Sequence, residues 1–203
     1  MKMKLALAAM AFAATMAAGY IHRIGDNDGY GIGIADGANH PFNGFTANYD
    51  GRDAAEMAAT DGAQYTDTYS TTHPGYGPQP GTVATFIWSS VPNLTAAYLL
   101  IDMADFQAST FGAVAVTFNG IAQNWAFNDG FPSTRIRDFQ LSQAVVDSIN
   151  LLGSLTVVID RNNSSDFYGF DFAELREGTV PEPATWAMIG AGMAAIGMLR
   201  RRR

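Results

Sequence analysis

Two short apolar stretches, one at each end of the 203-residue chain, limit the part that can fold as a domain. Residues 1–19 read MKMKLALAAMAFAATMAAG, in which two lysines precede an apolar run and small residues follow it. This order is typical of a secretory signal peptide, so we expect cleavage after Ala17, Ala18 or Gly19. The alternative is an N-terminal helix buried in the fold, and the positively charged start argues against it.

The C-terminal end also combines an apolar run with basic residues, but here the basic residues follow the run. Residues 184–199 are uncharged and apolar, and as a helix they would span ~24 Å, close to the thickness of a hydrocarbon core. They are followed by Arg200, Arg201, Arg202 and Arg203, which would stop the helix on the cytoplasmic side. They are preceded by Pro181, Glu182 and Pro183, which are predicted to be extended because proline does not fit inside a helix.

This tail resembles the PEP-CTERM sorting signal of Gram-negative bacteria, which the membrane protease-transpeptidase exosortase recognises. The resemblance covers residues 180–203 and includes the Pro-Glu-Pro motif, the apolar helix and the arginine cluster in that order. It implies export across the inner membrane, transient anchoring there, processing by exosortase, and delivery to the cell surface or to an exopolysaccharide biofilm matrix. A plain tail anchor is the alternative. The predicted organisation is therefore a signal peptide at 1–19, a body at 20–179 and a sorting signal at 180–203.

The charge of the body excludes some partners. Residues 20–179 contain six arginines and no lysine against 18 carboxylates, a formal charge of about −12. Nucleic acid is not expected as a partner, because binding phosphates needs a basic surface. The chain has no cysteine, which excludes disulfides and thiolate metal sites. Aspartate outnumbers glutamate 15 to 4, and short carboxylates favour turns and cation-binding loops.

Short strands dominate the body. Asn119 and Gly120 join two of them and predict a tight hairpin, because both residues tolerate a positive φ. One helix is predicted to begin after Ser142 and to end at Gly153. Residues 39–81 are predicted to form long loops with one or two strands and a short helix near 53–60. The predicted strands are 30–35, 82–88, 96–103, 113–118, 121–127, 155–160 and 169–175.

This pattern predicts an all-β fold, a β-sandwich flanked by the signal-peptide helix and the C-terminal transmembrane helix. The body resembles the jelly-roll domains of the galactose-binding and carbohydrate-binding-module kind.

The sequence GDNDGYG at 25–31 is the first candidate site. Asp26 and Asp28 alternate, and the glycines let the backbone fold around a centre, which suits calcium. The resemblance to jelly-roll modules, in which a structural calcium often lies between an early loop and the final strand, implies Asp171 as a partner, with Asp36 as a weaker candidate. A plain turn is the alternative. A second acidic stretch, 160–166, is predicted to be a hydrated turn.

Aromatic side chains beside polar residues are the second candidate. Trp125 has Asn124 before it and Asn128 after it, and Tyr168 follows Asp166, so both rings are predicted as platforms for a sugar. Burial in the core is the alternative for each.

Catalysis has little support in the sequence. The three histidines are scattered, and no G-x-S-x-G nucleophile motif occurs. We therefore expect a non-enzymatic exported protein that associates with exopolysaccharide, with calcium as a possible structural ion. The alternatives are a self-associating structural matrix protein without specific glycan binding, and a secreted glycan hydrolase whose carboxylate pair is set by the fold.

Overall fold

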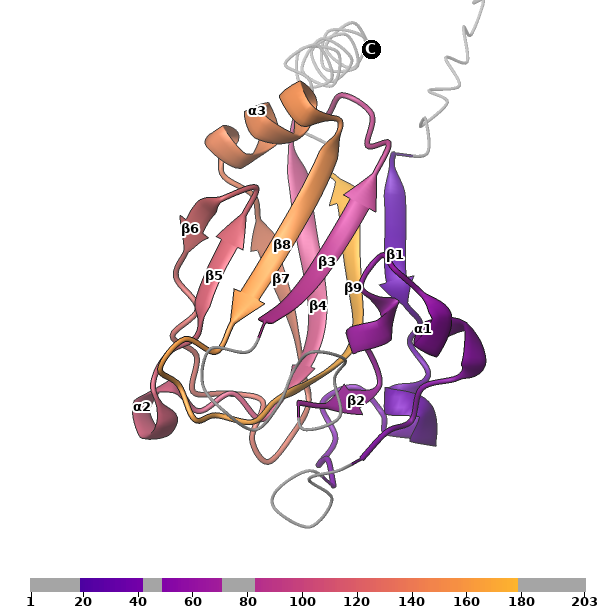
Figure 1. The fold of residues 1–203 in the computed structure, drawn as a ribbon, viewed down its shortest axis with the longest axis vertical. Coiled ribbons are helices and arrows are strands. Elements are labelled where there is room, and N and C mark those ends of the chain that lie inside the picture. Colours follow the sequence, from indigo (N-terminus) through magenta and orange to yellow (C-terminus); the bar gives the residue numbers. More distant parts are fainter. Residues whose placement is uncertain (1–18, 42–48, 71–82, 179–203) are drawn as a thin grey trace, which may run out of the picture.

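The body is a sandwich of two antiparallel sheets packed face to face (Figure 1). The computed structural model describes residues 19–41, 49–70 and 83–178. In one sheet the strand order is β1 (Ile21–Gly25), β9 (Gly169–Glu177), β4 (Ala97–Ala104) and β7 (Arg135–Gln140), with β2 (Thr68–Tyr69) also pairing with β9. In the other sheet the order is β3 (Val83–Ser89), β8 (Ser154–Asp160), β5 (Ala115–Phe118) and β6 (Ile121–Gln123). The predicted β-sandwich is confirmed.

The core lies between the sheets because apolar residues alternate along the strands that face it. On β3, Phe86 and Trp88 are fully buried while Ile87 between them is partly exposed. On β8, Leu155, Val157 and Ile159 follow the same alternation. Successive side chains of a strand point to opposite faces, so this pattern is what one buried face requires.

The two helices that the sequence predicted are present. In α3 (Gln143–Leu152) the Ser142 side chain accepts from the Val145 N–H, and Gly153 ends the helix in the left-handed conformation with φ 65°. α1 (Ala54–Ala58) carries a capping box formed by Asp53 and Glu56. A short α2 (Ala108–Phe111) and a 3₁₀ turn, η2 (Ala63–Tyr65), were not predicted.

The two ends of the sandwich differ in what they carry (Figure 1). β1 begins and β9 ends at the same end as α3, and we call this the tail end because residues 179–203 follow from it. At the opposite end of the sandwich, strands β1 and β4 finish and strand β9 begins. Strand β2 and helix α2 are also located there. We call this the loop end.

Three features of the sheets differ from the sequence-based predictions. Residues 30–35, predicted as a strand, form η1 (Gly29–Gly33), a single π-helical turn in which Tyr30 and Gly31 have positive φ. Strands β1 and β7 were missed, because His22, Arg23, Arg135 and Arg137 interrupt their apolar pattern. Both strands lie at an edge of their sheet, where such charges are common.

The third difference is a bulge in β9. Ile101 of β4 pairs with Ala173, and Met103 pairs with Phe170, so β9 has one residue more than β4 in this interval. Phe170 and Phe172 therefore do not share one face of β9: Phe170 packs in the main core, whereas the Arg23 guanidinium lies 4.4 Å from the centre of the Phe172 ring. Bulges commonly redirect side chains beside functional sites.

The signal peptide at 1–19, the Pro181–Glu182–Pro183 motif and Arg200–Arg203 lie almost entirely outside the described residues. Within the described ranges, no helix has the length and apolar character needed to cross a membrane.

Candidate metal centre and adjoining pocket

The first loop folds tightly because its glycines occupy positions closed to other residues. Gly31 has φ 70°, and a Cβ there would lie 2.2 Å from the carbonyl oxygen of Gly51. Asp28 fixes the turn, since its Oδ1 accepts from the Gly31 N–H at 2.6 Å. The loop is thereby held against the segment at Gly51, and the carboxylates of Asp26 and Asp28 are brought to the loop end of the sandwich.

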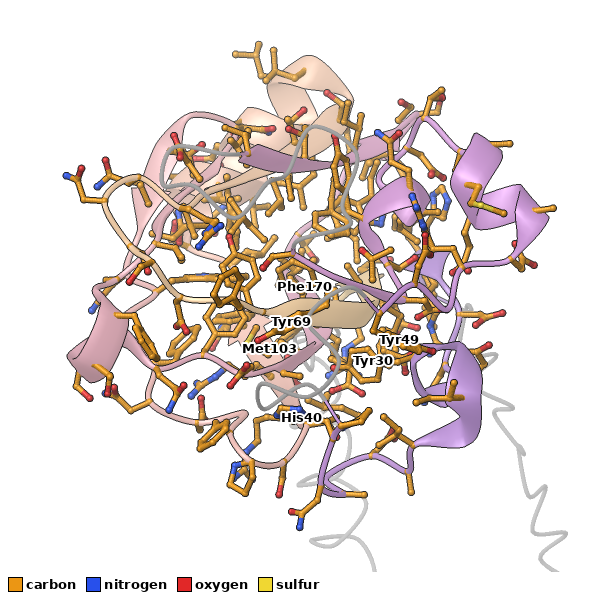
Figure 2. All side chains as sticks on the ribbon, turned by 60° about the horizontal axis from the view of Figure 1, so that its bottom comes forward. Tyr30, His40, Tyr49, Tyr69, Met103 and Phe170 are labelled. Atoms are coloured by element: carbon orange, nitrogen blue, oxygen red, sulfur yellow. The ribbon has the colours of Figure 1, made fainter. Side chains whose placement is uncertain are left out.

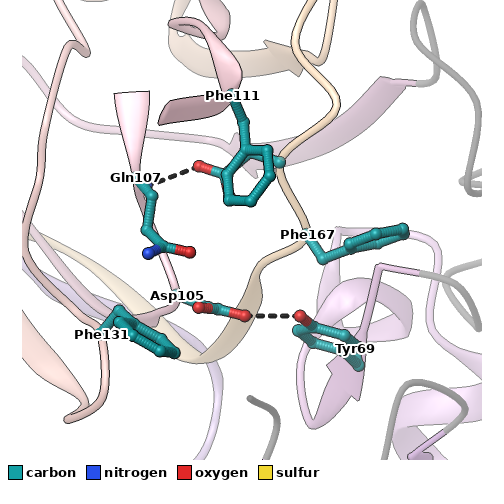
Figure 3. A pocket seen from close by; sticks show the side chains of 7 residues that line it. Tyr69, Asp105, Gln107, Phe111, Phe131 and Phe167 are labelled. Atoms are coloured by element: carbon teal, nitrogen blue, oxygen red, sulfur yellow. Dashed lines mark hydrogen bonds between the residues drawn. The ribbon is translucent and has the colours of Figure 1, made fainter. Parts of the chain in front are cut away.

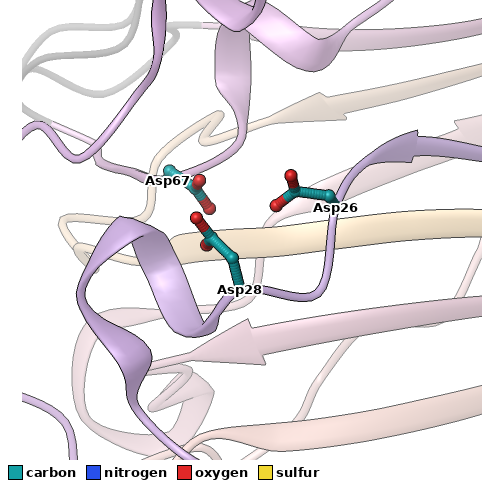
Figure 4. Close-up of side chains that lie close together, drawn as sticks. All are labelled: Asp26, Asp28 and Asp67. Atoms are coloured by element: carbon teal, nitrogen blue, oxygen red, sulfur yellow. The ribbon is translucent and has the colours of Figure 1, made fainter.

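Asp26, Asp28 and Asp67 form what we call the outer group. One carboxylate oxygen from each lies within 4.8 Å of the others, as the convergence in Figure 4 shows. Asp26 and Asp28 are exposed, whereas Asp67 is 0% exposed. Neither oxygen of Asp67 meets a hydrogen-bond donor among the described residues. A buried carboxylate without a donor is costly, because burial removes the water that would otherwise stabilise its charge.

Asp36, Asp102 and Asp171 form a second set, the inner group, with the same 4.8 Å limit between their oxygens. The β9 bulge brings Asp171 beside Asp102, which lies between the two β4 residues that flank the bulge. Asp102 and Asp171 are 1% and 0% exposed. Asp171 Oδ1 accepts from the Tyr30 N–H at 2.9 Å, whereas Asp102 Oδ1 has no donor among the described residues.

The two groups touch, and their proximity affects the pKa values of the buried members. The carboxyl groups of Asp67 and Asp171 lie within hydrogen-bonding reach of each other. Burial raises the pKa of Asp67 well above its usual range, and neighbouring carboxylates raise it further. Burial and then the nearby Asp171 and Asp36 raise the pKa of Asp102 to about 7. The six carboxylates therefore repel one another at neutral pH unless protons or cations neutralise them.

The structure brings together part of the predicted calcium site. Asp26 and Asp28 lie side by side as predicted. Asp171 belongs to the inner group, and its carboxyl group contacts that of Asp67, the third member of the outer group. Sequence reasoning missed Asp67 and Asp102. A signal for Asp102 was present, because it is a carboxylate in the middle of the apolar run AYLLIDM.

A cavity of about 360 Å³ lies beside these groups at the loop end (Figure 3). In Figure 3, the Asp105 carboxylate and the Gln107 amide face the same space, with Phe131 on one side and Phe167 on the other. The side chains of Phe111 and Phe131 are 39% and 42% exposed, so a ligand can reach these rings. The cavity is lined by Tyr69, Asp105, Gln107, Phe111, Phe131, Asp166 and Phe167.

The polar groups of this loop-end pocket are held in fixed positions. Tyr69 donates its O–H to Asp105 Oδ2 at 2.5 Å, and the Gln107 N–H donates to Asp166 Oδ2 at 2.6 Å. Burial raises the pKa of Asp105 to about 7 and that of Asp166 to about 6. Asp105 also has a positive φ of 69°. Non-glycine residues adopt this conformation rarely, and such strain is concentrated at functional sites.

The predicted sugar platforms, Trp125 and Tyr168, are wrong. Trp125 is 2% exposed and stacks on Phe139 with ring centres 5.1 Å apart. Tyr168 is 0% exposed and stacks on Phe106 at 4.6 Å. Both rings complete the core, so neither face is available to a ligand. Among the described residues, the exposed rings at the loop end are those of Phe111 and Phe131, which the sequence analysis did not select.

Three chain segments connect the carboxylate groups to the pocket. Asp67 lies just before β2, and Tyr69 lies in β2. Asp102 lies near the end of β4, and Asp105 directly follows this strand. Phe167 lies just before β9, and Asp171 lies near its start. Each segment therefore contributes one carboxylate of a group and one residue of the pocket wall. Tyr30 and Tyr69 also share a small apolar cluster with Ala104, and Figure 2 shows these two tyrosines at the loop end.

Known proteins match two separate parts of the chain. No curated protein matches its sequence. Among solved structures, the body resembles the Podospora anserina GH26-CBM35 β-(1,4)-mannanase, at 20% identity and a TM-score of 0.34 over 51% of this chain and 21% of that chain. It also resembles a family 35 carbohydrate binding module from an environmental isolate, at 12% identity and a TM-score of 0.30 over 51% of this chain and 75% of that chain. A third is the ANX2 ectodomain of Arabidopsis thaliana, at 12% identity and a TM-score of 0.33, over 49% of this chain and 30% of that chain.

The tail has a match of its own. Residues 179–203 match the family model described as the PEP-CTERM protein-sorting motif. This motif indicates export and processing at the membrane by an exosortase. The sorting signal that the sequence predicted is thus confirmed: the chain carries a PEP-CTERM protein-sorting motif at its C-terminal end.

Proposed function

We propose that this protein is an exported, non-enzymatic module that binds a polysaccharide in the loop-end pocket. Its setting would be the surface or exopolysaccharide matrix of a Gram-negative bacterium, after exosortase has processed the tail. The observation that carries the proposal is the pocket itself, in which exposed rings surround a carboxylate and an amide. Aromatic faces stack on the C–H patches of sugars, and a few polar groups fix the orientation of the hydroxyls.

The position of the pocket supports this role. The pocket-lining segments lie at the loop end, whereas the sorting tail follows β9 at the tail end (Figure 1). The pocket therefore lies at the end of the sandwich opposite to the end where β9 finishes.

We also propose that calcium binds the outer group. The residues fit a hard cation, because all three supply carboxylate oxygens and the buried oxygens of Asp67 have no donor within the described part of the chain. Asp26, Asp28 and Asp67 would hold the ion, which would supply the positive charge that this group lacks. Because Asp67 lies two residues before Tyr69, ordering Asp67 would also order one wall of the pocket.

A hydrolase is the second candidate, and one observation favours it. Asp105 and Asp166 line the same pocket, and burial raises the pKa values of both, as a general acid requires. Binding is the better proposal because both carboxyl groups are already held by donors, Tyr69 and Gln107. A self-associating matrix protein is the third candidate, and it would need no pocket.

The test is retention of the full-length protein, purified in mild detergent, on the host's exopolysaccharide with calcium and with a chelator. We expect retention in calcium, weaker retention in chelator, and no release of reducing ends. Phe131→Ala should abolish most of the retention, whereas Leu151→Ala, which removes a side chain 84% exposed at the tail end, should not change it.

Reducing ends released by the wild-type protein, and not by Asp105→Asn, would establish the hydrolase instead. An absence of retention in both conditions would overturn sugar binding and favour the matrix protein, which should then assemble with increasing concentration.

A further inference from the structure

We propose that the loop-end pocket selects polysaccharides with free amino groups, and that it holds a protonated sugar amine between the Asp105 carboxyl group and the exposed rings of Phe111 and Phe131. The inference rests on the proposed polysaccharide binding and names the class of sugar that the pocket prefers. A protonated amine presents one positive charge and three hydrogen-bond donors, whereas N-acetylation removes the charge.

The wall of the pocket is acidic. Asp105 and Asp166 line it, and no lysine, arginine or histidine is among its described lining residues. Residues 20–179 as a whole carry a formal charge of about −12. A polysaccharide with carboxylate or sulfate groups would therefore be repelled, whereas a polysaccharide with protonated amines would be attracted.

Two basic residues contact rings of the pocket wall, and neither of them lines the pocket. The Arg161 guanidinium is fully buried and lies 5.0 Å from the centre of the Phe167 ring. The His40 ring packs edge-on against Phe131, and burial lowers the pKa of His40, so that this ring is uncharged at neutral pH. The interior of the pocket therefore keeps its negative charge for a ligand.

Asp105 is the carboxyl group that lacks a partner for one of its oxygens. Its Oδ2 accepts from the Tyr69 O–H, whereas its Oδ1 is buried and has no donor among the described residues. Buried carboxylate oxygens nearly always have a donor. Burial raises the pKa of Asp105 to about 7, whereas Arg161 is close enough to Asp166 to favour the ionised form of that residue. A sugar amine at Asp105 would supply both a donor and a positive charge.

The rings of the pocket suit both parts of an amino sugar. Phe111 and Phe131 are accessible, and in Figure 3 Phe131 lies beside the Asp105 carboxylate. Aromatic faces stack on the C–H patch of a sugar, and the same faces attract a cation through their negative centre. A neutral sugar would use the rings alone and would leave the Asp105 oxygen without a charged donor.

The test compares hexamers of glucosamine and of N-acetylglucosamine, which differ only in their acetyl groups. Isothermal titration calorimetry on the full-length protein in mild detergent, at neutral pH with calcium, measures both affinities. We expect the wild type to bind the glucosamine hexamer about tenfold more tightly. In Asp105→Asn this preference should fall to about threefold, because only the attraction to the rings remains. Asparagine also tolerates the positive φ of this position.

Two further variants make the comparison specific to the pocket. Gln107→Glu adds a carboxylate that faces the same space and leaves the backbone N–H on Asp166 in place, so the preference should rise by about threefold. Asp147→Asn removes one charge from an exposed position of α3, and it should keep the tenfold preference of the wild type.

The outcomes separate this inference from the proposed function. Equal affinities of the wild type for the two hexamers, or no binding of either, would overturn the selection of amines. A preference that Asp147→Asn lowers as much as Asp105→Asn would also overturn it, because the overall charge of the protein would then be the cause. Retention on the host's exopolysaccharide that depends on Phe131 would in each case preserve the proposed binding function, and its absence would overturn that function.

Discussion

The middle of the sandwich and its loop end bury different kinds of side chain. Between the sheets, Phe86, Trp88 and Val157 are fully buried, in positions that the alternation of the strands requires. At the loop end, the side chains buried just as completely include Asp67, Asp102 and Asp171. Burial of apolar rings stabilises a fold, whereas burial of carboxylates that repel one another destabilises it. The core therefore stabilises the fold, whereas the buried carboxylates of the loop end lower its stability and form a site.

The backbone shows the same contrast. Tyr30, Asp67 and Asp105 have positive φ values of 61°, 53° and 69°, and they lie in η1, just before β2 and just after β4. The positive φ of Asn119, by comparison, belongs to the tight hairpin between β5 and β6, where the sequence predicted it. The positive φ values of Asp67 and Asp105 belong to residues with unpartnered carboxylate oxygens, as expected where a site is built before its ligand arrives.

The largest effect should come from the core. Trp125→Ala removes a buried ring that stacks on Phe139, and we expect a loss of about 3–5 kcal/mol in the free energy of unfolding. Chemical denaturation measures it. Retention of the remaining folded protein on polysaccharide should be unchanged, because the ring contacts no ligand. Unchanged stability together with lost retention would show that Trp125 acts as a sugar platform after all.

The next effect is the pH dependence of stability in chelator. Burial raises the folded-state pKa values of Asp102 and Asp105 to about 7 and that of Asp166 to about 6, against an ordinary value near ~3.9. The folded protein thus keeps protons that the unfolded chain releases between about pH 4 and 7, so stability is lost as the pH rises through this range. We expect Tm to fall by roughly 5 °C or more between pH 5 and pH 8 in chelator. A Tm that rises over that interval would contradict the raised pKa values.

Asp67→Asn should have a smaller effect, and its sign is informative. In chelator, the amide replaces a buried group that can ionise and can donate to Asp171, so we expect Tm to increase by a few degrees, roughly the effect of 1 kcal/mol. The same substitution should reduce calcium binding. Thermal unfolding of the variant and of Asp147→Asn in chelator measures the effect. A decrease in Tm would mean that Asp67 already has a stabilising partner.

The smallest effect should come from Asp105→Asn. The amide keeps the shape of the carboxyl group and can still accept from Tyr69, so we expect Tm to change little. Retention on exopolysaccharide should fall by roughly threefold, the effect of less than 1 kcal/mol, because a charged acceptor for sugar hydroxyls becomes neutral. Retention equal to that of the wild type would remove Asp105 from the binding surface and leave only the rings.

The sequence predicted the sandwich well because local patterns determine it. The alternation in 82–88 and 155–160, the Asn119–Gly120 turn, and the Ser142 and Gly153 caps each act within a few residues. β1 and β7 were not predicted because their own sequences lack a strand pattern. They are strands because they pair with β9 and β4. Residues 30–35 were predicted as a strand because glycines alternate with apolar residues there. The positive φ values of Gly29, Gly31 and Gly33 are not visible in that pattern.

The candidate site was predictable only in part, for a physical reason. Asp26 and Asp28 are neighbours in the sequence, so their proximity was visible there. Asp67 and Asp102 reach the site through pairing between strands and through the β9 bulge, which no local pattern encodes. Likewise, the burial of Trp125 depends on Phe106, Phe127 and Phe139, which come together only in the folded core.

The measurement that tests this account most directly is the thermal unfolding of the full-length protein at neutral pH, in calcium and in chelator. The account predicts that saturating calcium raises Tm by roughly 5 °C or more, because the ion binds only the folded loop end, and that Asp67→Asn loses most of this increase. An identical Tm in calcium and in chelator for the wild type would contradict the account, and would mean that the buried carboxylates are neutralised by protons alone.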